Sequence, residues 1–137
     1  MSKKYKAEYR VYYEDTDAGG IMYHGNFINF CERARSDLMR EIGYPCSELL
    51  QKLNFGFVVA GLNANYLKMV TLDQLLRVET SVIKMKNTSF VMNQSIFEQN
   101  SPVFNMEVTL VCVDARGKPV KIPDELHSKF KDYIEEK

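Results

Sequence analysis

The sequence predicts one α+β domain in which a five-stranded, mainly antiparallel sheet packs against one long helix. Three observations predict it: an alternating segment at the start, one long stretch with helical spacing, and a second half of alternating segments separated by short turns. Consecutive strands joined by short turns pair mostly antiparallel, and a single sheet then has one long helix to cover. No linker or repeat interrupts the chain, so we expect residues 1–137 to form a single domain.

The first expected strand covers residues 5–14. Apolar or aromatic side chains alternate there with charged ones, which is the period of a half-buried strand. The residues on the predicted core side are Tyr5, Ala7, Tyr9, Val11 and Tyr13. In this phase Tyr13 is expected to pack toward the core.

A long helix is expected over residues 26–42. Its apolar residues recur every three or four positions and form one stripe, namely Phe27, Phe30, Cys31, Ala34, Leu38 and Ile42. Gly43 and Pro45 are typical of a helix end. A short helix is expected over residues 47–53.

Four more strands are expected over residues 58–66, 76–82, 90–96 and 104–112, because apolar residues alternate in each. The alternation slips at Ile83 and Met85, which predicts a β-bulge. A terminal helix is expected from Pro123 to Ile134, with Leu126 and Phe130 spaced by four residues.

Composition excludes several classes of function. Eighteen basic and eighteen acidic residues give a formal net charge of zero, without the basic surplus typical of nucleic-acid binders. No apolar run fits a signal peptide or a membrane span, so we expect a cytoplasmic protein without membrane insertion. Three widely spaced cysteines and two histidines predict neither a disulfide framework nor a metal site.

The segment Y-E-D-T-D-A-G-G-I-M-Y-H-G-N at residues 13–26 concentrates polar groups between the first strand and the long helix. Asp15 and Asp17 precede two glycines, which allow unusual backbone angles. The N–H groups at a helix start can stabilise a developing negative charge. The same residues also fit simple turn and helix-capping roles. By composition alone, both interpretations stay open.

A resemblance bears on this choice. The run R-V-Y-Y-E-D-T-D-A-G-G-I-M-Y-H-G-N-F at residues 10–27 resembles the signature of the YbgC subgroup of 4-hydroxybenzoyl-CoA-thioesterase-like hot-dog proteins. Further matching stretches are F-C-E-R-A-R at 30–35, N-Y-L-K at 65–68, L-D-Q-L-L-R-V-E-T at 72–80 and V-T-L-V-C-V-D at 108–114. The resemblance covers nearly the whole chain in order. It implies the hot-dog fold, a five-stranded antiparallel sheet wrapped around one long central helix.

The resemblance implies hydrolysis of acyl-CoA thioesters to a carboxylic acid and CoA, without metal or organic cofactor. It places the catalytic aspartate at Asp17, flanked by Tyr13, which would orient groups, and His24, which would assist proton transfer. The backbone N–H of His24 or its neighbour would polarise the thioester carbonyl. Asp17 could act as nucleophile or as general base. Asp15 is expected to be structural.

Relatives carry several basic groups in the turn before S-F at residues 89–90, whereas this chain has only Lys84 and Lys86 there. Lys86 is the expected contact for a CoA phosphate, with an ordinary solvated turn lysine as the alternative. The resemblance also implies homodimers that assemble to tetramers, and it allows an acyl carrier protein as partner.

Two alternative functions remain at this point. One is a hot-dog hydratase or dehydratase, which would pair a catalytic histidine with an acid on the central helix. The other is a non-catalytic module of lipid synthesis that binds acyl thioesters or an acyl carrier protein. The complete set of Tyr13, Asp17 and His24 favours catalysis.

Overall fold

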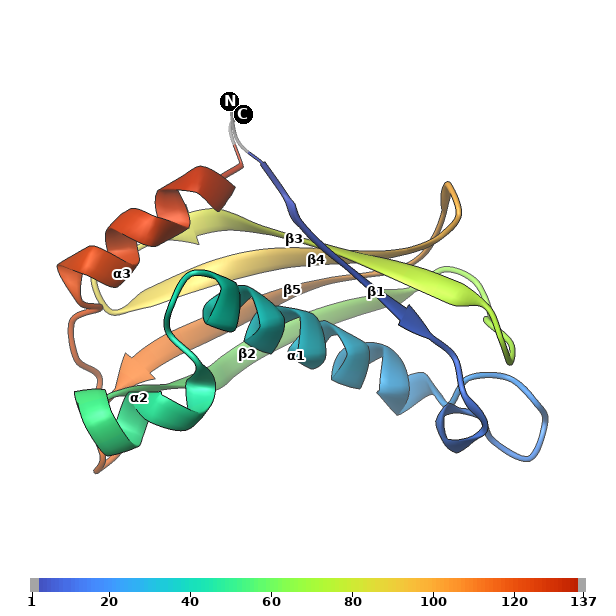
Figure 1. Cartoon of the computed structure of the whole chain (residues 1–137), viewed down its shortest axis with the longest axis horizontal. Coiled ribbons are helices and arrows are strands. Elements are labelled where there is room, and N and C mark those ends of the chain that lie inside the picture. The colour runs from blue at the N-terminus through green and yellow to red at the C-terminus, as the bar shows by residue number, and fades with distance from the viewer. Residues whose placement is uncertain (1–2, 136–137) are drawn as a thin grey trace.

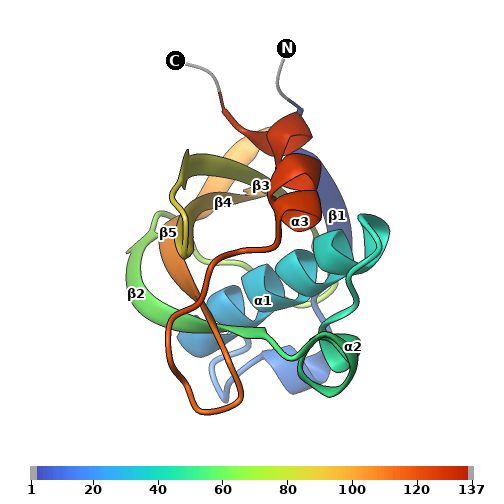
Figure 2. The ribbon, with the colours of Figure 1, turned by 90° about the vertical axis from the view of Figure 1, so that its left-hand side faces the viewer.

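The computed structural model describes residues 3–135 (Figure 1). Its elements in chain order are β1 (Tyr5–Arg10), η1 (Tyr13–Asp15), α1 (His24–Glu41), α2 (Cys46–Leu53), β2 (Gly56–Tyr66), β3 (Leu75–Met85), β4 (Ser89–Glu98), β5 (Ser101–Val113), α3 (Asp124–Lys129) and η2 (Phe130–Tyr133). The strands form one sheet in the order β1-β3-β4-β5-β2, and all neighbouring pairs are antiparallel. The sheet curves around α1 (Figure 2), so the predicted architecture is confirmed.

The long helix α1 fills the concave side of the sheet. It begins at His24, two residues before the predicted start, and its 18 residues span about 27 Å. The predicted apolar stripe is buried, and Phe30, Cys31, Ala34 and Leu38 have no exposed surface at all. The helix ends as expected, because Gly43 adopts a positive φ of 93° that residues with a side chain rarely adopt.

The first strand is shorter than predicted. β1 ends at Arg10, and the chain then turns through the single 3-10 turn η1. The carboxylate of Asp15 accepts the backbone N–H of Tyr12 at 2.9 Å, which bends the chain away from the sheet. The expectation that Tyr13 packs toward the core was therefore wrong, because its side chain is 80% exposed.

The remaining strands lie close to their predicted positions. The predicted bulge is confirmed by a register shift between Val82 and Lys84. A shift between Val59 and Gly61 was not predicted. It puts Val58 opposite the outward-facing Val111 and Leu62 opposite the buried Val108, so the uniform alternation expected for residues 58–66 is wrong at this point.

The terminal helix is also shorter than predicted. After α3 the chain continues as the 3-10 helix η2, and Ile134 is extended and bridges Val82 of β3. Leu126 and Phe130 are fully buried, as their spacing predicted. Within residues 3–135, no helix has an apolar stretch long enough to cross a membrane.

Candidate active site

Of the three residues predicted to be catalytic, Tyr13 and Asp17 lie in the loop between β1 and α1, and His24 is the first residue of α1. The loop precedes this helix start directly. It doubles back on itself: the N–H of Asp17 donates to the carbonyl of Ile21 at 2.9 Å, and the N–H of Gly20 donates to the carbonyl of Asp17 at 3.0 Å. Gly20 has a φ of +81°, which such a tight turn requires. The N–H of Met22 then donates to Val70 at 2.8 Å, which fixes the loop against the β2–β3 connection.

Asp15 ties this loop to the first turn of α1. Its buried carboxylate accepts the N–H of Tyr12 at 2.9 Å and the side-chain amide of Asn26 at 3.0 Å. Its carbonyl accepts the N–H of Tyr23 at 2.9 Å. Every one of these bonds holds backbone or a neighbouring side chain in place, which agrees with the structural role expected for Asp15.

Asp17, two residues later, is exposed. Its Oδ1 accepts the N–H of Gly19 at 2.8 Å. No other hydrogen bond in residues 3–135 reaches this carboxylate, so Oδ2 is free to meet a water molecule or a substrate carbonyl. A Cβ atom at position 19 would lie 3.3 Å from Oδ1 of Asp17, so glycine at this position avoids a tight contact with the carboxylate.

The start of α1 is open. Tyr23, the residue before the helix, makes no side-chain capping bond. Its carbonyl accepts the N–H of Asn26 at 2.9 Å, and no hydrogen bond among the described residues engages the N–H groups of His24 and Gly25. These two donors lie at the positive end of the helix dipole, and they are the ones that could hold a negatively charged oxygen.

His24 lines a cavity of 360 Å³ between the start of α1 and the end of β2. The wall is mainly apolar and consists of Ile21, Met22, Phe27, Tyr66, Leu67, Lys68 and Met69. The hydroxyl of Tyr66 donates to the carbonyl of His24 at 3.0 Å, and its ring packs edge-on against Phe27. These contacts fix the helix start to β2 and form an apolar recess beside the open N–H groups.

Tyr13 opens onto a different cavity, of 520 Å³, together with Tyr12, Glu14, Leu72 and Asp73. No hydrogen bond in residues 3–135 joins the side chains of Tyr13, Asp17 and His24. A single chain therefore presents the three residues on the β1–α1 loop and at the start of α1, all exposed, without bringing their functional groups into contact.

Lys86 lies far from this loop. It is exposed in the β3–β4 turn, where its N–H donates to the carbonyl of Ser89 at 2.8 Å. The other end of β3 meets the loop, since the N–H of Val11 donates to the carbonyl of Gln74 at 2.9 Å. The eleven residues of β3 span about 36 Å. In Figure 1 the β3–β4 turn and the β1–α1 loop lie at opposite ends of the sheet.

Several residues of the site are not predicted by the sequence. Tyr66 and Lys68 belong to the N-Y-L-K motif, whose spacing indicates no role for them, and no pattern predicts that Asn26 is a partner of Asp15. Nothing in the spacing shows that the end of β2 meets the start of α1. A motif of polar residues at a strand end was the one available signal.

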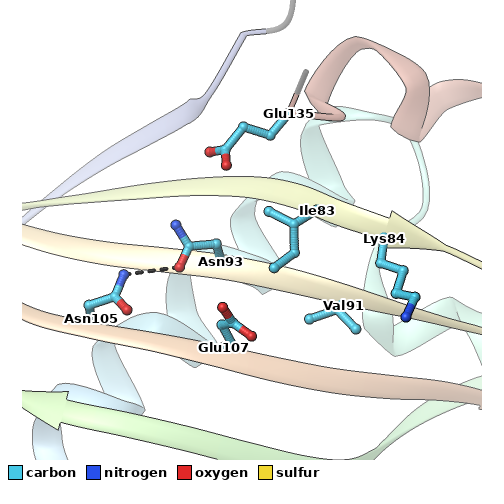
Figure 3. A pocket seen from close by; sticks show the side chains of 7 residues that line it. All are labelled: Ile83, Lys84, Val91, Asn93, Asn105, Glu107 and Glu135. Carbon is cyan, nitrogen blue, oxygen red and sulfur yellow. Dashed lines mark hydrogen bonds between the residues drawn. The ribbon is translucent and has the colours of Figure 1, made fainter. Parts of the chain in front are cut away.

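A larger cavity, of 640 Å³, lies on the sheet face turned away from α1 (Figure 3). Asn105 donates to Asn93 at 2.9 Å across its floor, and Lys84, Glu107 and Glu135 surround it. None of the residues predicted to be catalytic lines this cavity, so it is not the candidate active site.

Other reactive groups do not gather at the loop. Cys31 and Cys112 are buried, and burial raises the pKa of their thiols to about 12 and about 11, so neither is a ready thiolate nucleophile. Across residues 3–135, no three His, Cys, Asp or Glu side chains are grouped so that they could hold a metal ion. The chemistry available at the loop is that of a carboxylate, an imidazole and backbone N–H groups.

Comparisons with known proteins agree on one family. A model described as the thioesterase-like superfamily matches residues 11–130. The chain is 38% identical to the acyl-CoA thioesterase YbgC of Haemophilus influenzae, covering 88% of this chain and 90% of that protein. It is 37% identical to the acyl-CoA thioester hydrolase YbgC of Escherichia coli O6:H1, covering 89% and 92%. The crystal structure of a probable thioesterase from Bartonella henselae matches with a TM-score of 0.84 at 28% identity, covering 88% of this chain and 99% of that one.

Proposed function

The chain belongs to the thioesterase-like superfamily, and from that membership we propose that it hydrolyses acyl-CoA thioesters to a carboxylic acid and free CoA. The YbgC relatives confirm this activity, which the sequence predicted. The observation that carries the proposal within the structure is the exposed Asp17 carboxylate on a rigid loop. Ile21 and Met22 of that loop line the same apolar cavity as His24, at the open start of α1.

In this proposal the thioester carbonyl lies at the start of α1. The N–H groups of His24 and Gly25 donate to its oxygen as negative charge develops there, and fixed donors of this kind lower the barrier strongly. The adjoining apolar cavity holds the first part of the acyl chain against Phe27 and Tyr66. Tyr13 stays a proposed orienting group, and because it faces another cavity in one chain, it acts at the site that a second copy completes.

We assign Asp17 the role of general base. Its Oδ1 holds the N–H of Gly19, and its free Oδ2 accepts a proton from a water molecule. The water oxygen attacks the carbonyl carbon, the C–S bond breaks, and the protonated imidazole of His24 gives its proton to the departing thiolate. The competing route, direct attack by Asp17, would form a mixed anhydride instead.

Single-turnover hydrolysis in oxygen-18 water separates the two routes. With Asp17 as general base, the label appears in the product acid and never in the enzyme. Label recovered in the Asp17 carboxylate after one turnover would establish the anhydride and exclude the general-base role.

The activity itself is tested with a panel of short, long and aromatic acyl-CoA substrates, read by thiol release. We expect turnover of at least one class. Binding without any turnover would favour the alternative of a non-catalytic acyl-thioester or acyl-carrier-protein module. The hydratase alternative has less support, because the one histidine of α1 stands at its exposed start rather than on the face that meets the sheet.

We further propose that two copies dimerise through β2. This edge strand is 11 residues long, and among the described residues no further strand pairs with its free edge. It exposes large apolar side chains, namely Val58, Val59, Leu62 and Tyr66. A long, apolar, unpaired edge favours pairing with another strand. Antiparallel pairing of two β2 strands brings the β3–β4 turn of one copy beside the β1–α1 loop of the other.

That arrangement gives Lys86 a route to the substrate. Within one chain Lys86 is at the wrong end of the sheet, but the Lys86 of a second copy would lie near the Asp17 loop and could contact a CoA phosphate. Assembly to a tetramer and an acyl carrier protein as partner stay predictions.

Sedimentation of the purified protein tests the dimer. Replacing Leu62 with Lys puts a charge on the inner side of the edge strand and should give monomers with little activity. Glu107→Lys on the outer face of β5 makes the matched control and should stay dimeric. An active monomeric wild type would contradict the proposal.

A further inference from the structure

A smaller cavity contains the guanidinium of Arg35, which has no acidic partner among residues 3–135. We propose that this cavity binds the far end of the acyl group and selects acyl chains that end in a carboxylate. This inference rests on the proposed thioesterase function and adds the class of acyl group. It is carried by Arg35 of α1, by the residues that hold Arg35 in place, and by the apolar residues that lie between Arg35 and His24.

The cavity has a volume of 250 Å³ and lies between α1 and the inner face of the sheet. One wall is apolar and comes from α1, β2, β4 and β5: Met39, Phe57, Val59, Phe90, Met92 and Leu110. The polar wall comes from α1 and the start of α2, and includes Glu32, Arg35, Ser36 and Cys46. The cavity therefore suits an apolar chain with a polar end group.

The position of Arg35 is fixed by a buried network. Its Nη1 donates to Oε1 of Gln94 at 3.0 Å. Nε2 of Gln94 donates to the carbonyl of Cys31 at 2.9 Å and to the hydroxyl of Thr80 at 3.0 Å. Gln94 and Thr80 have no exposed surface. The guanidinium thus lines the cavity and is held in place by this network. Binding groups are most effective when their position is fixed in advance in this way.

The charge of Arg35 is not balanced by an ion pair. Among residues 3–135, no carboxylate lies within ion-pair distance of it, although Glu32 stands one helical turn earlier. Burial lowers the pKa of Arg35, which shows that its surroundings disfavour the charge. A guanidinium nevertheless stays charged in proteins. Within residues 3–135, Nη1 is the one nitrogen of Arg35 that makes a hydrogen bond. A carboxylate fits the remaining donors in a bidentate arrangement.

The same two elements line this cavity and the one beside His24. Along α1, His24 and Arg35 are 11 residues apart, or about 16 Å. Along β2, Tyr66 lines the first cavity and Val59 the second, with Leu62 and Ala64 on the inner face between them. Leu62 is 42% exposed within one chain, so an acyl chain laid along this seam would contact an apolar surface. The distance matches an extended acyl chain of roughly a dozen carbon atoms, since a zigzag of C–C bonds of about 1.5 Å advances about 1.3 Å per carbon atom.

The test compares dodecanoyl-CoA with its ω-carboxy counterpart, dodecanedioyl-CoA. Wild type should show a kcat/KM about tenfold higher for the ω-carboxylated substrate, from one charge-assisted pair. Arg35→Met should reverse this ratio, and Arg35→Lys, which keeps the charge and a donor to Gln94, should keep part of it. Arg33→Met, at an exposed position of the same helix, is the matched control and should leave the ratio unchanged.

Calorimetry with methyl esters, whose first carboxyl group carries no charge, tests the subsite without CoA thioesters. The monomethyl ester of dodecanedioate should bind wild type about tenfold more tightly than methyl dodecanoate, and Arg35→Lys should narrow this difference in affinity. A wild type that hydrolyses dodecanoyl-CoA but shows no preference in either measurement overturns the subsite and leaves the proposed function intact. Failure to hydrolyse any acyl-CoA overturns the proposed function, while the calorimetric preference still decides the subsite. Arg35→Met could instead dissociate the dimer and leave the ratio of kcat/KM for the two substrates unchanged. That result would assign Arg35 to the interface and would also overturn the subsite.

Discussion

Two regions of the molecule differ in how their polar side chains are paired. One is the layer between α1 and the sheet, and the other is the loop that leads into α1. In the layer, Gln94 and Thr80 are fully buried, and within residues 3–135 no buried side-chain polar atom lacks a partner. In the loop, Tyr13, Asp17 and His24 are exposed and share no hydrogen bond with one another. Polar groups that are satisfied within the chain stabilise the fold, whereas groups left free are available to substrate.

Asp15 and Asp17 show this contrast at the closest range. They are two residues apart and have the same side chain, yet Asp15 is buried with two side-chain bonds and Asp17 is exposed with one. The contrast teaches that residue type and spacing do not separate a structural acid from an acid proposed to be catalytic. Burial and hydrogen bonding do separate them.

The largest effect is expected at Asp17. Asp17→Asn keeps the volume and removes the charge and the base, so kcat/KM should fall by a factor of about 10³, or about 4 kcal/mol of transition-state stabilisation. The midpoint of urea unfolding should stay near that of wild type, because the side chain is exposed. Glu107→Gln on the outer sheet face is the matched control. A variant retaining more than about a tenth of the wild-type rate would remove Asp17 from the mechanism.

A substitution in the core should instead lower the stability of the fold. Leu38→Ala empties space in the fully buried face of α1 and should lower the free energy of unfolding by about 2–5 kcal/mol. Glu41→Ala, exposed on the same helix, should change it by no more than about 0.5 kcal/mol. Urea denaturation of both variants checks this. Equal losses for the two would mean that α1 does not pack as described.

His24 should affect rate without affecting stability. His24→Ala removes the proposed proton donor to the departing thiolate and should lower kcat about 100-fold. Because a general acid acts only while it carries its proton, the pH–rate profile should also change shape. An unchanged kcat and profile would restrict this position to its backbone N–H.

Asp15 should affect both quantities. Asp15→Asn replaces one accepting oxygen with a donor that faces either the Tyr12 N–H or the Asn26 amide. We expect a loss of about 1–3 kcal/mol in stability, together with a smaller loss of kcat than in Asp17→Asn, since the loop that holds Asp17 loosens. Full activity with full stability would contradict the anchoring role.

The smallest effect at neutral pH is expected at Tyr9, whose hydroxyl donates to Asp37 on the layer side of α1. Burial, followed by that hydrogen bond, raises the pKa of Tyr9 above its ordinary value. The folded state thus holds the proton more tightly, and this stabilisation is present below pH 10 and is lost as the pH rises further. Tyr9→Phe should cost about 1 kcal/mol at pH 7 and should reduce the alkaline loss of stability. An equal loss of stability at alkaline pH in Tyr9→Phe and in wild type would refute this account.

The sequence by itself determined the strand–helix order, the apolar stripe of α1, the bulge in β3 and the family, because each leaves a periodic or contiguous pattern in the chain. It also placed Tyr13, Asp17 and His24 on one loop. The end of the first strand could not be predicted from the sequence. A hydrogen bond from the backbone N–H of Tyr12 to the Asp15 side chain ends the strand, although the alternation continues to Glu14.

Only the tertiary structure decided which acid is buried and that Lys86 lies at the far end of the sheet. It also decided that Tyr66 of β2 and the following Lys68 lie beside the start of α1. It also decided that Arg35 is held by Gln94, 59 positions away in the chain. All of these depend on contacts between residues distant in sequence. Such contacts leave no local period, since they are set by how the sheet curves around the helix.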